Sequence, residues 1–198
     1  MNKKSFLISV AALMLPMAMH AQYTIYPVPH EQTAGTGKVS FTKNVNVICD
    51  NGIDQYTKKR VTNVFAEKGI TVNFSDAAST TESNVYLGIN GAKGKGNEVA
   101  TSLGLALDVL SKENKFDRHI LSLTDAGNGV AQLLVLGENT DATFMGLASL
   151  EQILDNGTSD LQTVTLNDYA DLKERGIIEG FYGKPYSSEV RKDLLRFM

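Results

Sequence analysis

Residues 130–154 read VAQLLVLGENTDATFMGLASLEQIL and contain a strand, a turn and a helix in that order. Leu133–Leu136 is apolar on both sides of a pleat, which is typical of a central strand covered by other elements rather than of an open edge. Asn139–Asp141 offers helix caps, and Leu147 and Leu150 lie on one stripe of the helix that follows. The stretch therefore predicts a buried strand with a helix packed on it.

Further strands are predicted on both sides of this unit. Residues 119–124 alternate in polarity, and the turn DAGNG at 125–129 joins them to the central strand as a hairpin. Other strands are predicted at Val39–Cys49, Ile70–Phe74, Asn84–Ile89 and Thr163–Leu166, with a helix from Tyr56 to Phe65 and a glycine stop at Gly69. This order predicts an α/β (α+β) fold, a small mixed sheet with helices on one face.

Composition limits the classes of partner. The chain has 198 residues, of which 42% are hydrophobic, enough for one core of ordinary size. Its formal net charge is −3, so no broad positive field favours nucleic acid or an anionic membrane. Cys49 is the only cysteine and lies in an alternating strand, so we interpret it as a small hydrophobic core residue.

The N-terminus has the pattern of a bacterial secretory signal peptide. Lys3 and Lys4 precede the short apolar run Phe6–Leu15, and cleavage is expected after Ala21. The run is too short to span a bilayer, so a membrane anchor is the weaker alternative. We therefore expect residues 1–21 to be removed, and a secreted or periplasmic protein with no membrane contact after cleavage.

Two patterns in the sequence bear on ligand chemistry. The loop NGAKGKGN at 90–97 combines glycines with lysine, but a phosphate-binding loop would need glycine at Ile89 and a hydroxyl residue at Gly96. We therefore predict a flexible surface loop. His30 and His119 have no companions at metal-ligand spacing, so neither a metal nor a cofactor is expected.

A polar linker marks a domain boundary near residue 171. The segment Asp168–Glu174 is rich in charge, and 22–170 before it forms one predicted domain. Beyond it, RGIIEGFYGKPY at 175–186 reads as a short buried strand that opens into a glycine-rich turn, and Ser187 or Ser188 can cap an amphipathic helix. One strand and one helix cannot bury both faces of the strand, so 171–198 is predicted to begin a larger (β/α)8 barrel.

These residues carry a resemblance to a known family. The run Arg175-Gly176, then Glu179-Gly180-Phe181-Tyr182-Gly183, then Pro185, is similar to the opening of the catalytic barrel in family 84 glycoside hydrolases. That family includes β-N-acetylglucosaminidases, O-GlcNAc hydrolases and enzymes called hyaluronidases. In its bacterial members an export signal and a small accessory α/β domain precede the barrel, in the order expected here. The resemblance implies an N-acetylglucosamine-containing glycan as partner.

The resemblance also implies roles for single residues. Gly180, Phe181, Tyr182 and Gly183 would lie at the carboxyl end of the first barrel strand and form part of the substrate-binding pocket. The Gly180 carbonyl would accept a hydrogen bond from a sugar hydroxyl, Tyr182 would wall the pocket, and Phe181 would pack into the barrel. Glu179 is interpreted as a structural partner. No catalytic residue is expected in this chain, because the family's aspartate pair lies on a later strand.

Two hypotheses follow. In the first, the chain is the N-terminal portion of an exported glycosidase that removes β-linked N-acetylglucosamine by a substrate-assisted retaining mechanism, and is inactive by itself. In the second, residues 22–170 form a non-catalytic carbohydrate- or protein-binding module. Family 20 hexosaminidases carry a similar accessory domain, but their barrel opening does not read Glu-Gly-Phe-Tyr-Gly.

Overall fold

The computed structural model describes residues 23–176, 178, 183 and 185–197, so the predicted signal peptide and its cleavage point lie outside the described residues. The centre of the fold is a seven-stranded sheet with the order β1-β7-β5-β6-β4-β2-β3. Its strands are β1 Glu31–Val39, β2 Asn44–Cys49, β3 Thr71–Phe74, β4 Ser83–Ile89, β5 Phe116–Asp125, β6 Ala131–Gly137 and β7 Leu161–Ala170. The helices are α1 Gln55–Ala66, α2 Lys95–Ser102, the 3-10 helix η1 Asp108–Ser111, α3 Thr140–Leu154 and α4 Ser188–Phe197.

The sheet is mixed, as predicted. Strands β3, β2, β4 and β6 run parallel to one another, whereas β5 pairs antiparallel with both β6 and β7, and β1 pairs antiparallel with β7. Strand β6 therefore lies in the middle, where the parallel half meets the antiparallel half. The hairpin β5–β6 and the strand–helix unit β6–α3 both form where the sequence predicts them.

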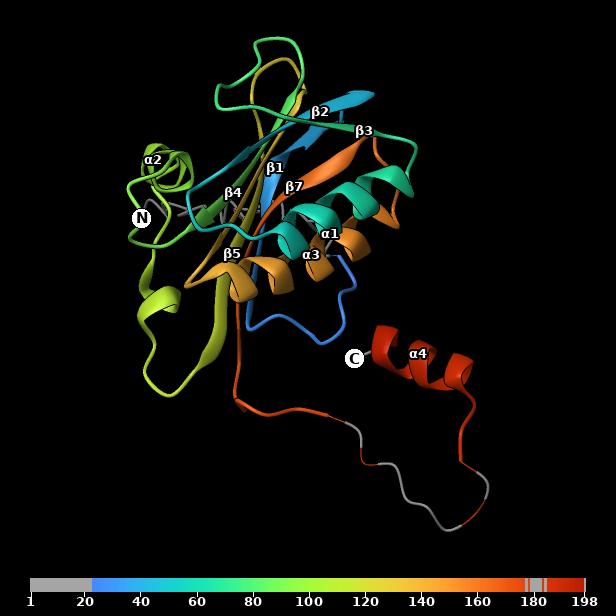
Figure 1. The fold of residues 1–198 in the computed structure, drawn as a ribbon. Coiled ribbons are helices and arrows are strands. Elements are labelled where there is room, and N and C mark those ends of the chain that lie inside the picture. Colours follow the sequence, from blue (N-terminus) through green and yellow to red (C-terminus); the bar gives the residue numbers. More distant parts are fainter. Residues whose placement is uncertain (1–22, 177, 179–182, 184, 198) are drawn as a thin grey trace, which may run out of the picture.

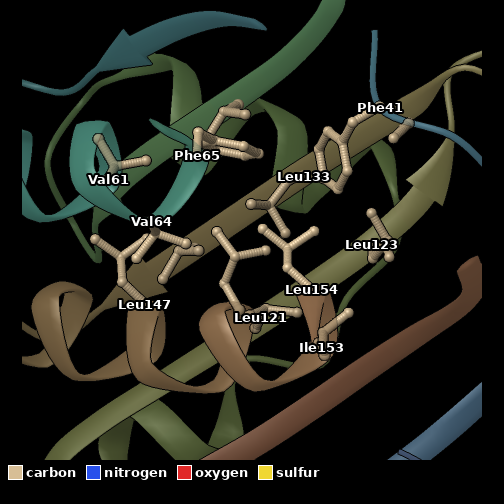
Figure 2. Packing of buried hydrophobic residues seen from close by; sticks show 14 of the residues in the cluster. Phe41, Val61, Val64, Phe65, Leu121, Leu123, Leu133, Leu147, Ile153 and Leu154 are labelled. Carbon is tan, nitrogen blue, oxygen red and sulfur yellow. The ribbon is translucent and has the colours of Figure 1, made fainter. Parts of the chain in front are cut away.

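Alternate side chains of the central strand enter two separate cores. Leu133 and Val135 of β6 pack in the larger core beneath α1 and α3, which run side by side over one face (Figures 1 and 2). Leu134 and Leu136 point to the other face and pack with α2 and η1. Helices α1 and α3 give the predicted helical layer on one face, and α2 with η1 adds a smaller layer on the other. The α/β fold class is confirmed.

Side-chain caps place the ends of the two large helices. The Asp54 carboxylate accepts a hydrogen bond from the Thr57 amide at 2.8 Å at the start of α1, and Asn139 does the same for Ala142 at 2.9 Å at the start of α3. After α1, Gly69 has a φ of +72°, the left-handed conformation expected of a glycine stop.

One predicted strand differs in the structure, and a second lies mostly outside the described residues. The predicted strand Val39–Cys49 is divided: Val39 ends β1, and β2 begins only at Asn44. Near the C-terminus, the described residues Arg175, Gly176 and Ile178 belong to no strand, and Ile178 is 97% exposed. The rest of the predicted strand and turn lies outside the described residues, so the start of a barrel at 171–198 stays a prediction. Helix α4 forms as predicted and lies apart from the sheet (Figure 1).

Candidate functional site

The structure does not test the predicted sugar-binding residues. Gly180, Phe181 and Tyr182 lie outside the described residues, as does Glu179. Gly183 is described and exposed, and a Cβ atom built on it would meet nothing within 4 Å. Within the described residues, nothing closes around Gly183. The substrate-binding role of Gly180–Gly183 therefore stays a prediction.

A different hollow lies where the chain leaves the sheet. This exit cavity has a volume of about 510 Å³, within the range of ligand pockets in proteins. Its walls come from the N-terminal segment 25–30, from α3, from the start of β5, from the end of β7 and from residues 171–175, which follow β7 and are called the linker from here on. Characteristic lining residues are Tyr26, Val28, His119, Met145, Leu172 and Arg175.

One glutamine holds the N-terminal segment over α3. The backbone amide of Tyr26 donates a hydrogen bond to Gln152 Oε1 at 2.7 Å, and Gln152 Nε2 donates one to the Tyr26 carbonyl at 2.9 Å. Because both backbone groups of Tyr26 pair with a single side chain, the segment is fixed in position along α3. The wall of the exit cavity that Tyr26 and Val28 form is thus attached to a rigid element.

A buried histidine lies in the wall opposite. His119 Nδ1 is 2.7 Å from the Asp117 carbonyl oxygen, which can only accept, so Nδ1 carries the proton. Its Nε2 atom is buried and has no hydrogen-bond partner among the described residues. Burial is the main cause that lowers the pKa of His119, and the contact with Asp117 opposes it. The ring packs tightly on α3, since a Cβ atom on Gly146 would lie 3.1 Å from His119 Cδ2.

A cluster of charged and aromatic side chains ties the linker to the domain. The His30 ring stacks on Tyr169 with centroids 3.6 Å apart, and its Nδ1 lies 2.9 Å from Asp168 Oδ1. Its Nε2 lies 3.6 Å from a carboxylate oxygen of Asp171, the first linker residue, which also binds Lys115 at 2.5 Å. Further along, the Arg175 guanidinium donates to the Asp117 carboxylate. These bonds fix the direction in which the chain leaves the sheet.

The two aspartates beside His30 are not suited to act as the proton-donating pair of a glycosidase. A general acid needs a raised pKa, whereas the hydrogen bond from Lys115 lowers the pKa of Asp171. Asp168 already accepts hydrogen bonds from the His30 amide at 3.3 Å and the Tyr169 amide at 2.9 Å. Both carboxylates therefore serve to hold the chain in place.

The glycine-rich loop 90–97 binds the carboxylate of Asp50, a residue of the same protein. The Asp50 carboxylate is buried and accepts a hydrogen bond from the Gly96 amide at 3.0 Å, at the start of α2. A Cβ atom on Gly94 would lie 2.1 Å from the same carboxylate. The prediction of a flexible surface loop is therefore wrong for its second half, where Lys95 to Asn97 are helical and Gly96 is buried. The rejection of a phosphate site agrees with this geometry, because Asp50 occupies the position of the anion.

The described residues offer neither a metal site, nor a membrane span, nor a reactive thiol. Among the described residues, no group of three or more His, Cys, Asp and Glu side chains is placed to hold a metal ion. None of the helices in the described ranges has the length and apolarity needed to cross a bilayer. Cys49 is half-buried against the larger core, and burial raises its pKa to about 11, so its thiol is poorly reactive.

Sequence reasoning missed the exit cavity. Its walls combine five segments that are far apart in the sequence, and no spacing pattern within any one of them indicates a hollow. The one available signal is the run Tyr26–Pro29, which places large apolar side chains in a segment that cannot pair within a sheet.

Comparisons with known proteins agree with the motif. The family described as "Glycosyl hydrolase family 20, domain 2" matches residues 22–169. A solved structure described as "Structure of CpGH84D" is 32% identical over 89% of this chain, with a TM-score of 0.80. A second, "Structure of CpGH84B", is 24% identical over 89% of the chain, with a TM-score of 0.69, and supports the fold alone.

The chain spans 28% of the length of each of these two structures. The motif at 175–185 predicted a likeness to family 84, and the CpGH84D structure confirms it. The chain belongs to the glycosyl hydrolase family 20 domain 2 family, and it is similar in sequence and fold to the family 84 structure CpGH84D.

Proposed function

We propose that this chain is the N-terminal portion of an exported glycosidase that removes β-linked N-acetylglucosamine from glycans or glycoconjugates. The observation that carries the proposal is the 32% identity to CpGH84D over 89% of the chain, combined with the motif Glu179–Gly183. Export is inferred from Lys3, Lys4 and the apolar run 6–15, so a secreted or periplasmic location is proposed with it.

The proposed reaction needs a pair of aspartates, which the family resemblance places on a later barrel strand. In a substrate-assisted retaining mechanism the acetamido oxygen of the sugar attacks the anomeric carbon, and two carboxyl groups manage the protons. The candidate pair near the exit cavity, Asp168 and Asp171, is engaged by His30 and Lys115. From the resemblance to family 84, we propose that the catalytic aspartates lie on a later strand, in a barrel of about 250 residues that continues past Met198. The 198-residue chain would then supply the accessory domain and part of the sugar pocket.

A chromogenic β-N-acetylglucosaminide tests the proposal directly. The purified 198-residue chain should give no turnover, whereas the product of a reading frame that continues past Met198 should hydrolyse the substrate. Turnover by the 198-residue chain, abolished by a substitution within it, would contradict the proposal. A continued frame without paired aspartates would contradict it too. Binding of residues 22–170 to a glycan array, with no hydrolysis by any longer product, would favour the binding module.

The role of Gly180 is tested in the longer, active protein. Gly180→Leu places a side chain where a sugar hydroxyl is proposed to approach the backbone, so kcat/KM should fall by at least about a hundredfold, equivalent to about 2.7 kcal/mol. Tyr56→Leu, at an exposed position of α1, serves as the control and should leave kcat/KM unchanged. Unchanged kinetics for Gly180→Leu would remove this residue from the proposed pocket.

A further inference from the structure

Large apolar side chains surround the exit cavity and face solvent. Tyr26 and Val28 are each 70% exposed, Leu172 is 67% exposed and Met145 is 39% exposed. These four side chains, which we call the apolar rim, come from the N-terminal segment, from α3 and from the linker. Exposed apolar side chains that line one hollow are typical of an interaction site, whereas single exposed apolar residues are common on any protein.

Hydrogen bonds and ion pairs within the domain fix the segments that carry the rim. Gln152 fixes Tyr26 on α3 through two hydrogen bonds, and Met145 belongs to α3 itself. Leu172 lies between Asp171, which binds Lys115, and Arg175, which binds Asp117. A surface whose side chains are already ordered loses little conformational entropy on binding. The rim therefore has the rigidity of a docking surface.

The charged groups beside the cavity already have partners within the protein. Asp171 binds Lys115 and Asp117 binds Arg175, while Asp168 is hydrogen-bonded to the His30 ring and to two backbone amides. A partner therefore needs no counter-charge at these positions. What the surface still exposes to solvent is apolar area. The occupant that fits is a protein surface with aliphatic or aromatic side chains at its centre, as is usual in the middle of an interface.

The position of the linker indicates which protein surface docks at the rim. Leu172 and Arg175 line the cavity, so the region after the linker is tethered at the rim and reaches it at a high effective concentration. The chain spans 28% of the length of CpGH84D, so that relative has a much larger remainder. We infer that the exit cavity and its apolar rim dock the catalytic region that follows the linker in the longer protein. This inference rests on the proposed function.

Thiol labelling tests the docking surface without disturbing it. Val28→Cys and Leu172→Cys each place a thiol on the rim, and Tyr56→Cys places one at a position of α1 that is 66% exposed and outside the cavity. Cys49 contributes little background because it is half-buried with a pKa raised to about 11. In the 198-residue chain all three thiols should react rapidly with a maleimide.

In the longer protein the two rim thiols should react at least about tenfold more slowly, while Tyr56→Cys keeps its rate. Equal rates in the two proteins, in a longer protein that hydrolyses the sugar substrate, would overturn the docking surface and leave the proposed function intact. Protection of the rim already in the 198-residue chain, at a concentration where it self-associates, would assign the surface to a second copy and overturn the inference. Absence of a longer product would contradict the proposed function first, and this inference with it.

Discussion

The backbone amide of Gly96 donates a hydrogen bond to the buried carboxylate of Asp50 at 3.0 Å. This contact joins the end of β2 to the start of α2 and explains why the loop between β4 and α2 is rich in glycine. Gly88 and Gly96 also meet directly, because a Cβ atom on Gly96 would lie 2.7 Å from the Gly88 Cα atom. The glycines thus allow a helix to approach a strand closely while its first turn binds a carboxylate.

Gly94→Ala should therefore destabilise the fold. The φ of Gly94 is −127°, which any residue adopts, so the cost comes from the collision with Asp50 and not from backbone strain. We expect the free energy of unfolding to fall by about 1–3 kcal/mol in urea denaturation. Gly176→Ala is the matched control, since its Cβ atom would meet nothing within 4 Å. Equal stability of the two variants would show that Asp50 moves aside without cost.

Because β6 contributes to a core on each face of the sheet, substitutions of two neighbouring β6 residues should lower the free energy of unfolding by similar amounts. Leu133 packs beneath α1 and α3, whereas Leu134 packs with α2 and η1, and both are fully buried. Leu133→Ala and Leu134→Ala should each lower the free energy of unfolding by about 2–5 kcal/mol. Leu195→Ala, at a position that is 69% exposed, is the control. A loss below about 1 kcal/mol for Leu134→Ala would mean that α2 and η1 form no effective second core.

Burial of His119 predicts loss of stability in mild acid. Its pKa is lowered in the folded state, so below pH 6.5 the unfolded chain takes up a proton that the folded chain does not. Unfolding is then favoured by up to about 1.4 kcal/mol per pH unit, from pH 6.5 down to the folded-state pKa. Urea denaturation at pH 7.5 and 5.5 should show this decrease for the natural chain and a smaller one for His119→Gln. The same decrease in both proteins would assign the effect to other groups.

The bonds of Asp171 predict that the linker becomes accessible when they are removed. Asp171→Asn abolishes the charge that binds Lys115 and faces His30, so the linker should detach more often without loss of global stability. Trypsin should then cleave after Lys173 and Arg175 severalfold faster, as measured by mass spectrometry of timed digests. Asp76→Asn, an exposed position far from the linker in sequence, should change nothing. Unchanged cleavage would indicate that Arg175 and Asp117 alone hold the segment.

The sequence predicts those elements whose side-chain pattern is set by a buried face. Helix α3 and strand β6 follow from an apolar stripe and from a doubly apolar strand, and the hairpin before them follows from its glycine-rich turn. Strand β1 shows no such pattern, because it is an edge strand whose residues are exposed or only partly buried up to Val39. Its hydrogen bonds to β7 form through the backbone, so its side chains carry little information about pairing.

The candidate sites were less accessible to sequence reasoning. The motif at Glu179–Gly183 indicates a family but lies outside the described residues except for Gly183. The exit cavity depends on Gln152 reaching Tyr26 and on Arg175 reaching Asp117, which are separated by 126 and 58 positions. Contacts of this kind exist only once the sheet has assembled, so no local spacing predicts them.

The pairing of Glu31 with Asn167 brings the two ends of the sheet fold to one corner, because the first strand and the last strand are neighbours. A domain whose two ends lie close together can be inserted into a polypeptide or deleted from it as one piece, because the strand pairing within the domain does not depend on the flanking chain. The same sheet could therefore be combined, over evolutionary time, with catalytic domains of different specificity.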